Sequence, residues 1–387
     1  MNDNSDIDIS NNNNNTIKLK NNNKIHININ LLNQYINALL VNVNSKKIPK
    51  NVNLIFDSGA VNGLLGVGAA LYINNLQKKE YLKVNKVSGC SIGSIIAVWY
   101  LCGCPDLIYV FLEDLFNYYK TNKNFFIYEK IITESIYKLF HNDDLSILNN
   151  VLYINYRDTK KHKQCIVSNF SSRDHLIETI LKSSHIPYIT KNVYKLNDCY
   201  IDGISPYILK TGNSECKNIF IKLIDLYNPL QSVNIKNEHN IYTRLLKGVS
   251  ETNDFFINNN TTLCMYTTCF IETQLCIRKL FVLFIIFIID YIIIINNNLP
   301  DYVKKSMLYN KSIYLGKDIW NYIIDTLVWN YTGNCDENVL NFLGSNVPFG
   351  QLYKHASNGT RLQKSELYPW DKQFVNDSNP SFVDGLL

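Results

Sequence analysis

The chain of 387 residues can hold one large domain or two modest ones, and with 46% hydrophobic and only 18% charged residues it has the composition of a globular protein. Its formal net charge of +5 is a weak basic bias, without the lysine and arginine stripes that neutralise phosphates, so we expect no nucleic-acid partner. A weak positive charge favours contact with an anionic surface such as phospholipid.

Residues 1–50 predict a disordered tail. They contain an asparagine run from Asn11 to Asn15 and a low-complexity segment with few side chains that could pack. No apolar signal segment precedes residue 51, and the ten cysteines form neither a CxxC pair nor a cluster at zinc spacing. We therefore expect reduced thiols, an intracellular, cytoplasmic location without a signal peptide, and no metal site.

From Asn51 to about residue 226 the sequence predicts alternating strands and helices. Helices are expected after the glycine-rich turn that follows the first strand, after Ser91 and over most of residues 105–160, and residues 173–189 are expected to form a helix and a turn. The predicted strands lie at 54–56, 84–88, 164–170, around 201, and at 217–224. This order implies parallel strands joined by helical crossovers, which is an α/β fold.

The later segment Leu280–Ile295 is apolar except for Asp290 and follows Arg278 and Lys279. As a helix it would rise about 24 Å, which is short of the roughly 30 Å hydrocarbon core of a bilayer. Three interpretations stay open: a buried core helix or strand, a segment that sits in or on a membrane, and a spanning helix accommodated by tilt or a thin bilayer.

The run Gly89-Cys90-Ser91-Ile92-Gly93 matches G-x-S-x-G between a predicted strand and a predicted helix. In that context the glycines leave room for a sharp turn that raises the serine hydroxyl above the sheet, and the helix N-terminus favours a nearby oxyanion. The pattern therefore predicts a nucleophile elbow at Ser91, with a plain tight turn as the alternative.

A nucleophilic serine needs a base, and the sequence offers two. Asp202 follows an apolar strand and precedes Gly203, which suits a carboxylate that points into a cleft. His239 is the one histidine that could complete a Ser-Asp-His triad, although a surface position suits it better. We expect Asp202 to act directly on Ser91.

A second glycine-containing loop follows the first predicted strand, with Gly59 and Gly63 ahead of a helix rich in small residues. Unpaired backbone N–H groups in such a loop could hold a phosphate or an oxyanion. The spacing fits neither a dinucleotide fingerprint nor a P-loop, and a serine elbow follows one crossover later. The oxyanion role is therefore favoured.

Together these motifs resemble the patatin-like phospholipase family. That family has a G-G-G-x-R-G loop, a G-x-S-x-G elbow and an Asp-Gly-Gly/Ala turn, which correspond here to Ser58–Gly63, Gly89–Gly93 and Asp202–Ile204. The segment LIETILKSSHIPYI resembles the helix and Ser-Ser-x-x-Pro turn that precede the family's aspartate. The resemblance covers about residues 51–226 and is closest to the triglyceride lipase and adiponutrin branch.

The resemblance implies a three-layer α/β/α domain over 51–226 that hydrolyses fatty-acyl esters of lipids at a membrane or droplet surface, without a cofactor. It leaves 227–387 as a C-terminal extension, a lid or a membrane dock. It implies a catalytic pair of Ser91 and Asp202. The remaining implied site residues are the oxyanion positions Gly59, Ala60, Val61, Gly63 and Ile92, the elbow glycines Gly89 and Gly93, and the turn residue Gly203.

The chain departs from the family pattern at four positions: Ser58, Ala60, Asn62 and Ile204. Ala60 is compatible with an oxyanion loop if its φ is negative, and a β-branched Ile204 would be strained at any positive φ. The alternative function is therefore a catalytically degenerate, membrane-binding member of the fold.

A weaker alternative is a dinucleotide-dependent enzyme that uses the glycine-rich loop together with Tyr119 and Lys123 in a chance Y-x-x-x-K. It leaves Ser91 and Asp202 without a role. A second Asp-Gly, at Asp384-Gly385, is interpreted as coincidence.

Overall fold

The computed structural model describes residues 31–104, 107–122, 125–211, 216–225, 232, 242–259 and 261–328. The chain divides into two compact units. Residues 31–43 belong to the first unit, and the described residues from 44 onward belong to the second, which contains the sheet and the candidate site.

Part of the expected N-terminal tail is ordered. Residues 31–39 are helical and continue into the 3₁₀ turn η1 (Leu40–Asn42), and η2 (Ser45–Lys47) follows. Leu32, Ile36 and Leu40 are buried, and their four-residue spacing places them on one helical face. The prediction of disorder is therefore wrong for residues 31–50, where an apolar stripe stands among the asparagines, and residues 1–30 lie outside the described part.

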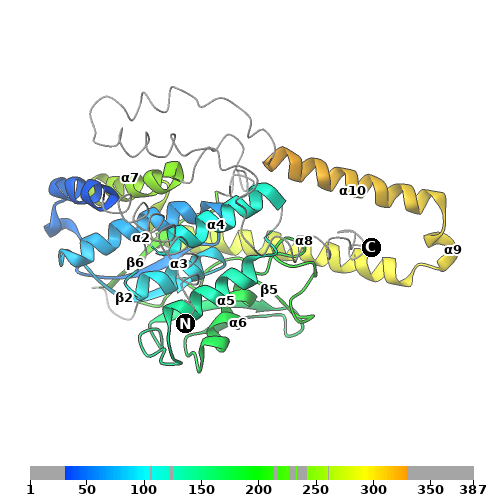
Figure 1. The fold of residues 1–387 in the computed structure, drawn as a ribbon, viewed down its shortest axis with the longest axis horizontal. Coiled ribbons are helices and arrows are strands. Elements are labelled where there is room, and N and C mark those ends of the chain that lie inside the picture. The colour runs from blue at the N-terminus through cyan, green and yellow to red at the C-terminus, as the bar shows by residue number, and fades with distance from the viewer. Residues whose placement is uncertain are drawn as a thin grey trace, which may run out of the picture. The chain divides into compact units, whose positions relative to one another are not determined.

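A seven-stranded, mostly parallel sheet forms the centre of the second unit (Figure 1). Its strands are β1 (Asn51–Phe56), β2 (Lys83–Gly89), β3 (Leu152–Asp158), β4 (Lys163–Val167), β5 (Tyr200–Asp202), β6 (Cys216–Ile221) and β7 (Cys264–Tyr266). The order is β4-β3-β2-β1-β6-β7, and β5 pairs with β3. The expected α/β fold is confirmed.

The central strands β3, β2, β1 and β6 are parallel, whereas β4, β5 and β7 pair antiparallel at the margins. Parallel neighbours end at the same edge of a sheet, so the loops after β1, β2 and β6 gather there. This edge carries the residue before the oxyanion loop, Asp57, and the elbow serine, Ser91.

The helices that follow the first strands match the expectation. They are η3 (Ala60–Asn62), α2 (Gly63–Lys78), α3 (Ile92–Leu101), α4 (Leu107–Asn122), α5 (Tyr128–Leu139) and α6 (Arg173–Ser183). The expectation of mostly helix over 105–160 missed β3, whose alternating apolar and polar residues are interrupted by charges.

The sheet does not end at residue 226, where the sequence suggested a domain boundary. Helix α7 (Tyr242–Asn258) packs on α2, where the Tyr72 hydroxyl donates to Asn253 Oδ1 at 2.9 Å, and β7 then pairs with β6. Part of the segment assigned to an extension therefore belongs to the same core as the catalytic motifs.

The apolar segment 280–295 lies in one long helix, α8 (Cys269–Asn298), which is followed by α9 (Asp301–Lys304) and α10 (Met307–Val328) (Figure 1). Within the described part of the chain, α8 is the one helix long and apolar enough to cross a membrane, and only 6% of its most apolar window is buried. The interpretation as a buried core helix or strand is therefore wrong, because α8 exposes most of its apolar side chains.

Candidate active site

Ser91 lies at the tight turn between β2 and α3, in the backbone conformation that a nucleophile elbow requires. Its φ of 55° and ψ of −129° are strained for a non-glycine residue. A Cβ on Gly89 would lie 2.3 Å from the Gly93 carbonyl oxygen, and a Cβ on Gly93 would lie 2.5 Å from the Phe56 carbonyl oxygen. The two glycines are therefore needed because backbone segments approach each other closely on both sides of the serine.

A hydrogen-bonded chain holds the elbow against the neighbouring strand. The Ser91 N–H donates to Ser183 Oγ at 3.0 Å, and Ser183 Oγ donates to the Asn155 carbonyl oxygen at 2.8 Å. Ser183 is the first serine of the Ser-Ser turn after α6, and it is fully buried. The Ser-Ser turn that the sequence predicted therefore holds Ser91, the residue before α3, in place.

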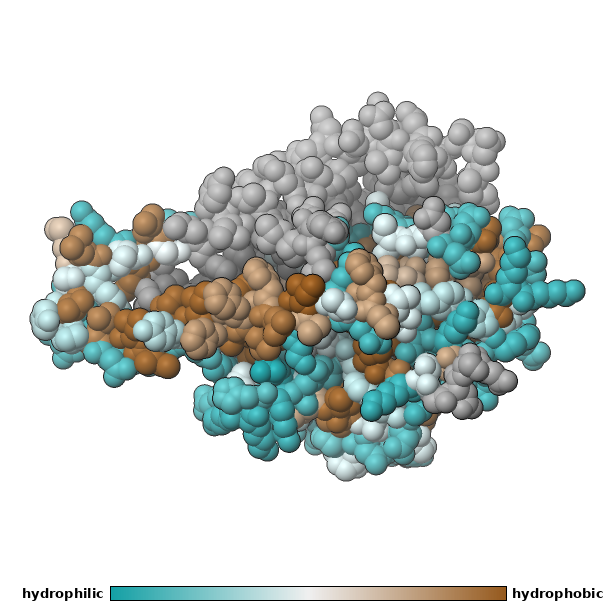
Figure 2. Space-filling view, turned by 180° about the vertical axis from the view of Figure 1, so that it is seen from behind, coloured by the Kyte–Doolittle hydropathy of each residue, from teal (hydrophilic) through white to brown (hydrophobic). Residues whose placement is uncertain are grey.

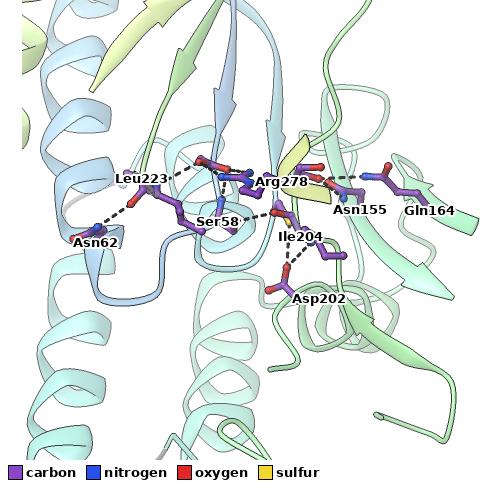
Figure 3. Close-up of polar contacts among 12 residues, drawn as sticks. Ser58, Asn62, Asn155, Gln164, Asp202, Ile204, Leu223 and Arg278 are labelled. Atoms are coloured by element: carbon purple, nitrogen blue, oxygen red, sulfur yellow. Dashed lines mark hydrogen bonds and ion pairs between the residues drawn. The ribbon is translucent and has the colours of Figure 1, made fainter. Parts of the chain in front are cut away.

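Asp202 ends β5, and its carboxylate accepts three hydrogen bonds, two of which are drawn in Figure 3. The donors are the Ile204 N–H at 2.7 Å, Cys90 Sγ at 3.5 Å and the side chain of Ser91. Burial raises the pKa of Asp202 to about 6, and the three hydrogen bonds together with Arg278 limit the rise. The structure therefore brings Ser91 and Asp202 together, with a carboxylate that is basic enough to accept a proton.

The nearest described histidine is engaged elsewhere. His185 Nε2 lies 3.3 Å from the Tyr194 carbonyl oxygen, and its Nδ1 lies 3.2 Å from Thr190 Oγ1. Neither ring nitrogen is free to take the Ser91 proton, so His185 contributes only its carbonyl oxygen, which accepts from the Asp202 N–H at 3.0 Å. His239, the candidate third member of a triad, lies outside the described residues.

The loop after β1 approaches the elbow as the sequence predicts. Gly59 is extended at φ 179°, and the 3₁₀ turn η3 brings Ala60 and Val61 into the wall of the pocket that contains Ser91 and Ile92. Ile92 is the first residue of α3, whose leading N–H groups have no intrahelical acceptor. The N–H groups of the loop and of Ile92 are therefore available to one oxyanion.

Gly63 differs from the other predicted oxyanion positions. Its N–H already donates to the carbonyl oxygens of Ala60 and Val61 as α2 begins, so it has no donor to offer an oxyanion. A Cβ at Gly63 would lie 2.4 Å from Cγ1 of Ile92, which shows that this glycine lets α2 pack against the elbow helix.

Ala60 and Ile204 both have a positive φ, which is the case in which strain is expected at each position. Ala60 has a φ of +44° and Ile204 a φ of +68°, in the left-handed region that disfavours both residues. Neighbouring contacts hold both positions: the Asn62 N–H donates to the Gly59 carbonyl oxygen at 2.8 Å, and Ser58 Oγ donates to the Ile204 carbonyl oxygen at 3.1 Å. A backbone hydrogen bond therefore closes the turn at Ala60, whereas the turn at Ile204 is held by the side chain of Ser58, which the family pattern lacks.

Ser58 and Asn62, two departures from the family pattern, have structural roles. The Ser58 contact joins the oxyanion loop to the Asp202 turn (Figure 3). The Asn62 side chain donates to the Leu223 carbonyl oxygen at 2.8 Å and accepts from Arg244. Gly203 completes the turn beside Asn155, where an added Cβ would lie 2.3 Å from the amide nitrogen. These contacts attach the loop to the turn on one side and to the segment after β6 on the other.

A buried ion pair behind the loop was not anticipated from the sequence. Arg278 of α8 donates to Asp57 through both terminal nitrogens, at 2.8 Å from Nη1 to Oδ2 and 2.5 Å from Nη2 to Oδ1. Asp57 Oδ1 also accepts from the Ser58 N–H at 2.9 Å. Burial alone would lower the pKa of Arg278, but the Asp57 carboxylate outweighs it and raises that pKa, so the guanidinium stays charged.

The pocket beside Ser91 is largely apolar. Its polar margin is formed by Ser184 and Thr190, and Ser184 accepts a hydrogen bond from the Tyr128 hydroxyl at 2.5 Å. The apolar lining comes from the loop after β1, from helices α2, α3 and α4, and from the segments before α5 and after α6, namely Ala60, Val61, Leu64, Ile92, Leu112, Leu115, Phe125 and Ile186. A hydrocarbon chain suits this pocket better than a charged nucleotide does.

Other motifs that the sequence singled out do not reach the site. Tyr119 is buried and stacks on Phe125 with ring centroids 4.2 Å apart, which is a packing role. Its partner in the chance Y-x-x-x-K, Lys123, lies outside the described residues, as do Asp384 and Gly385.

The site thus combines a serine at a tight strand-to-helix turn, at the edge of a mostly parallel sheet, with a glycine loop and the partly buried carboxylate of Asp202. Residues 54–204 match the family model described as patatin-like phospholipase, and this match supports the resemblance to that family. The match supports lipid acyl hydrolase activity in general terms and does not distinguish branches of the family. No curated protein sequence matches the chain.

Proposed function

We propose that the protein hydrolyses fatty-acyl esters of lipids through an acyl-serine intermediate on Ser91, with Asp202 as the base. The observation that carries this proposal is the strained Ser91, in the wall of an apolar pocket and hydrogen-bonded to a partly buried Asp202 whose pKa is raised to about 6. A serine in this setting is activated by the adjacent base rather than by its own acidity.

The chemistry follows from this arrangement. Asp202 takes the Ser91 proton as Ser91 Oγ attacks the ester carbonyl, and the N–H groups of Gly59, Ala60 and Ile92 stabilise the oxyanion. When the intermediate collapses, the alcohol leaves with the proton from Asp202. Asp202 then takes a proton from a water that attacks the acyl-serine, and it returns that proton to Ser91 Oγ as the fatty acid leaves, which restores the Ser91 hydroxyl and the Asp202 carboxylate.

The substrate class is a membrane or droplet lipid, either a phospholipid or an acylglycerol. The apolar pocket lining supports an acyl chain, and we retain the resemblance to the triglyceride lipase and adiponutrin branch as a prediction. A cytoplasmic location at a membrane surface remains part of the same proposal.

The alternative is a degenerate, membrane-binding protein. The positive φ values of Ala60 and Ile204 favour it, because a left-handed alanine or isoleucine stores strain at the two turns that turnover requires. The hydrogen bonds that hold both turns support turnover instead.

Fatty-acid release tests the proposal. Wild-type protein, Ser91→Ala and Asp202→Asn are each incubated with phosphatidylcholine vesicles and with a triacylglycerol emulsion, and free fatty acid is quantified. We expect release by the wild type on at least one surface and a loss of at least about 1000-fold in both variants. Equal release by all three proteins would contradict the proposal.

A further inference from the structure

The outer side of α8 exposes a long apolar surface that nothing in the described part of the chain covers. Figure 2 shows this surface as a continuous hydrophobic band along the helix. Its exposed members include Leu280, Phe281, Phe284, Phe287, Tyr291 and Ile294, each between 57% and 65% exposed. Apolar surfaces of this extent on a protein mark an interaction site.

The inner side of α8 is fastened to the domain by polar contacts. Lys279 Nζ donates to Gln164 Oε1 at 2.8 Å, and the Tyr194 hydroxyl donates to the Ile286 carbonyl oxygen at 3.3 Å. The one charge within the apolar segment, Asp290, pairs with Lys195 at 2.7 Å. These charged and hydroxyl groups hold α8 against the domain. A helix that crosses a bilayer alone would lack such contacts, so α8 does not fit that interpretation.

The fastening contacts belong to the segments that build the catalytic site. Arg278 binds Asp57, the residue before the oxyanion loop. Tyr194 and Lys195 belong to the same loop as Ser184 and Thr190, which line the pocket. Whatever binds the outer side of α8 is therefore held beside the pocket and the oxyanion loop.

The charges around the apolar band identify the partner. The exposed Lys305 and Lys311 follow its end, while Asp290 and Lys279 are engaged on the inner side by Lys195 and Gln164. An aromatic and aliphatic face followed by exposed lysines fits the surface of a bilayer with anionic head groups. The apolar face would enter the acyl chains, and the ammonium groups would stay at the phosphates.

We propose that the outer face of α8 docks on the surface of a lipid bilayer, and that the Arg278–Asp57 ion pair makes Arg278 a positioning residue that ties this docking helix to the oxyanion loop. The positioning role of Arg278 rests on the proposed hydrolase function, whereas the docking of α8 on a bilayer does not. A bilayer bound by α8 would present its lipids next to the pocket. Through the Arg278–Asp57 ion pair, the helix that binds the membrane would also position the oxyanion loop.

Vesicle binding tests the docking face. Full-length wild type, Phe281→Ser/Phe284→Ser, and the control Ile147→Ser/Ile166→Ser are sedimented with vesicles of phosphatidylcholine alone and of phosphatidylcholine with phosphatidylserine. Ile147 and Ile166 are exposed apolar residues outside α8. We expect the wild type and the control to bind, more tightly when phosphatidylserine is present, and the α8 variant to bind at least tenfold more weakly, with its thermal midpoint unchanged.

Other occupants would give other results. Equal vesicle binding by the α8 variant, or no binding by the wild type, would overturn the docking face. Self-association of the wild type that the variant loses, without vesicle binding, would assign the face to a second copy of the chain. Resistance of membrane-bound wild type to alkaline carbonate would indicate a spanning helix and would also overturn the proposal.

Hydrolysis of a water-soluble butyrate ester without vesicles tests the positioning role. We expect Arg278→Met to lower kcat at least tenfold at unchanged KM and to bind vesicles like the wild type, and Arg278→Lys to recover part of kcat. Because loss of one partner from a buried pair can prevent folding, Asp57→Asn/Arg278→Met serves as a second variant without an unpaired charge.

A folded Asp57→Asn/Arg278→Met variant should show the same loss of kcat. Wild-type kcat in both folded variants would overturn the positioning role while the docking result stands. An inert wild type that still binds vesicles would overturn the proposed hydrolase function and the positioning role together, so the two failures are distinguishable.

Discussion

Asp202 sets the pH range in which the site can act. Burial raises its pKa to about 6, and only the ionised carboxylate can accept the Ser91 proton. We therefore predict that kcat/KM for a soluble ester falls as the pH drops through about 6 and is constant above about pH 7. A pH profile measured between pH 3 and 8.5 checks this, and an acid limb near pH 4, the value of an unperturbed aspartate, would contradict the raised pKa of Asp202.

Arg278 also acts on this titration, because its charge lowers the pKa of Asp202. Removal of the charge should leave the carboxyl more easily protonated. We predict that the acid limb of Arg278→Met moves to higher pH than that of the wild type, whereas Arg278→Lys stays close to the wild type. Identical pH profiles for all three proteins would show that the charge of Arg278 does not affect the pKa of Asp202.

Ala60 occupies a backbone conformation that suits glycine. With a φ of +44°, its Cβ is strained by about 1 kcal/mol or more. We predict that Ala60→Gly, which also restores a glycine of the family pattern, raises the free energy of unfolding by about 1 kcal/mol. Ala97→Gly inside α3 is the control and should lower it by at least about 1 kcal/mol, as measured by urea unfolding. A loss of stability in Ala60→Gly would contradict the assigned conformation.

Among individual residues, the sequence predicted those that belong to a short motif. It missed the ion pair of Asp57 and Arg278, which belong to none. Ser91 and Asp202 were found because a turn pattern surrounds each of them. Asp57 and Arg278 lie 221 positions apart, and neither belongs to a motif that implies a partner. The left-handed conformations of Ala60 and Ile204 were also missed, because contacts from Ser58 and the η3 turn, rather than local preference, hold them.

Among the elements, the junction of β1, β2 and α3 tolerates the least change. A Cβ on Gly93 would meet the carbonyl oxygens of Phe56 and Asp57 at 2.5 Å, and backbone atoms cannot move aside as a flexible side chain does. We predict that Gly93→Ala loses about 3 kcal/mol or more of stability, or fails to fold.

Gly316 in α10 is the matched control, because an added Cβ there meets nothing within 4 Å. Gly316→Ala should gain about 1 kcal/mol from helix propensity. Thermal unfolding midpoints of the two variants and the wild type check both predictions. An unchanged midpoint for Gly93→Ala would mean that the elbow packs less closely than described.

Element types were predictable where an apolar run met a turn signal. The strands β1, β2, β4, β5 and β6 and the helices α2, α3 and α6 lie close to their predicted positions. Strand β3 was missed, because Asn155, Tyr156 and Arg157 break its apolar run. Its place between β2 and β4 depends on pairing that a local pattern does not contain.

For the whole molecule, the catalytic domain extends past the residues that carry its motifs. Helix α7 packs on α2, β7 extends the sheet beside β6, and α8 supplies Arg278 to Asp57. We predict that a chain of residues 44–226 is insoluble or unfolded, because it exposes the apolar side of α2 and leaves Asp57 buried without its partner.

A chain of residues 44–328 should be soluble, with a cooperative thermal transition. Expression of both fragments, followed by the soluble fraction and circular dichroism on heating, checks the prediction. A folded and active 44–226 fragment would show that the later helices are dispensable to the domain.

The domain boundary at residue 226 could not be corrected from the sequence, because β7 has three residues and α7 lacks a motif. The apolar segment was recognised, but its exposure was not, since a buried helix and a surface helix of the same composition have the same hydropathy. Only the positions of Lys195, Gln164 and Asp57 show which side of α8 faces the domain.

The central claim is that Ser91 is a nucleophile activated by Asp202, and covalent labelling tests it most directly. Purified wild type, Ser91→Ala and Asp202→Asn are treated with a fluorophosphonate ester, and the modified peptide is identified by mass spectrometry. The account predicts stoichiometric modification of Ser91 in the wild type, none in Ser91→Ala, and labelling of Asp202→Asn slowed by at least about 100-fold. A folded wild type that remains unlabelled, or is labelled at another residue, would contradict it.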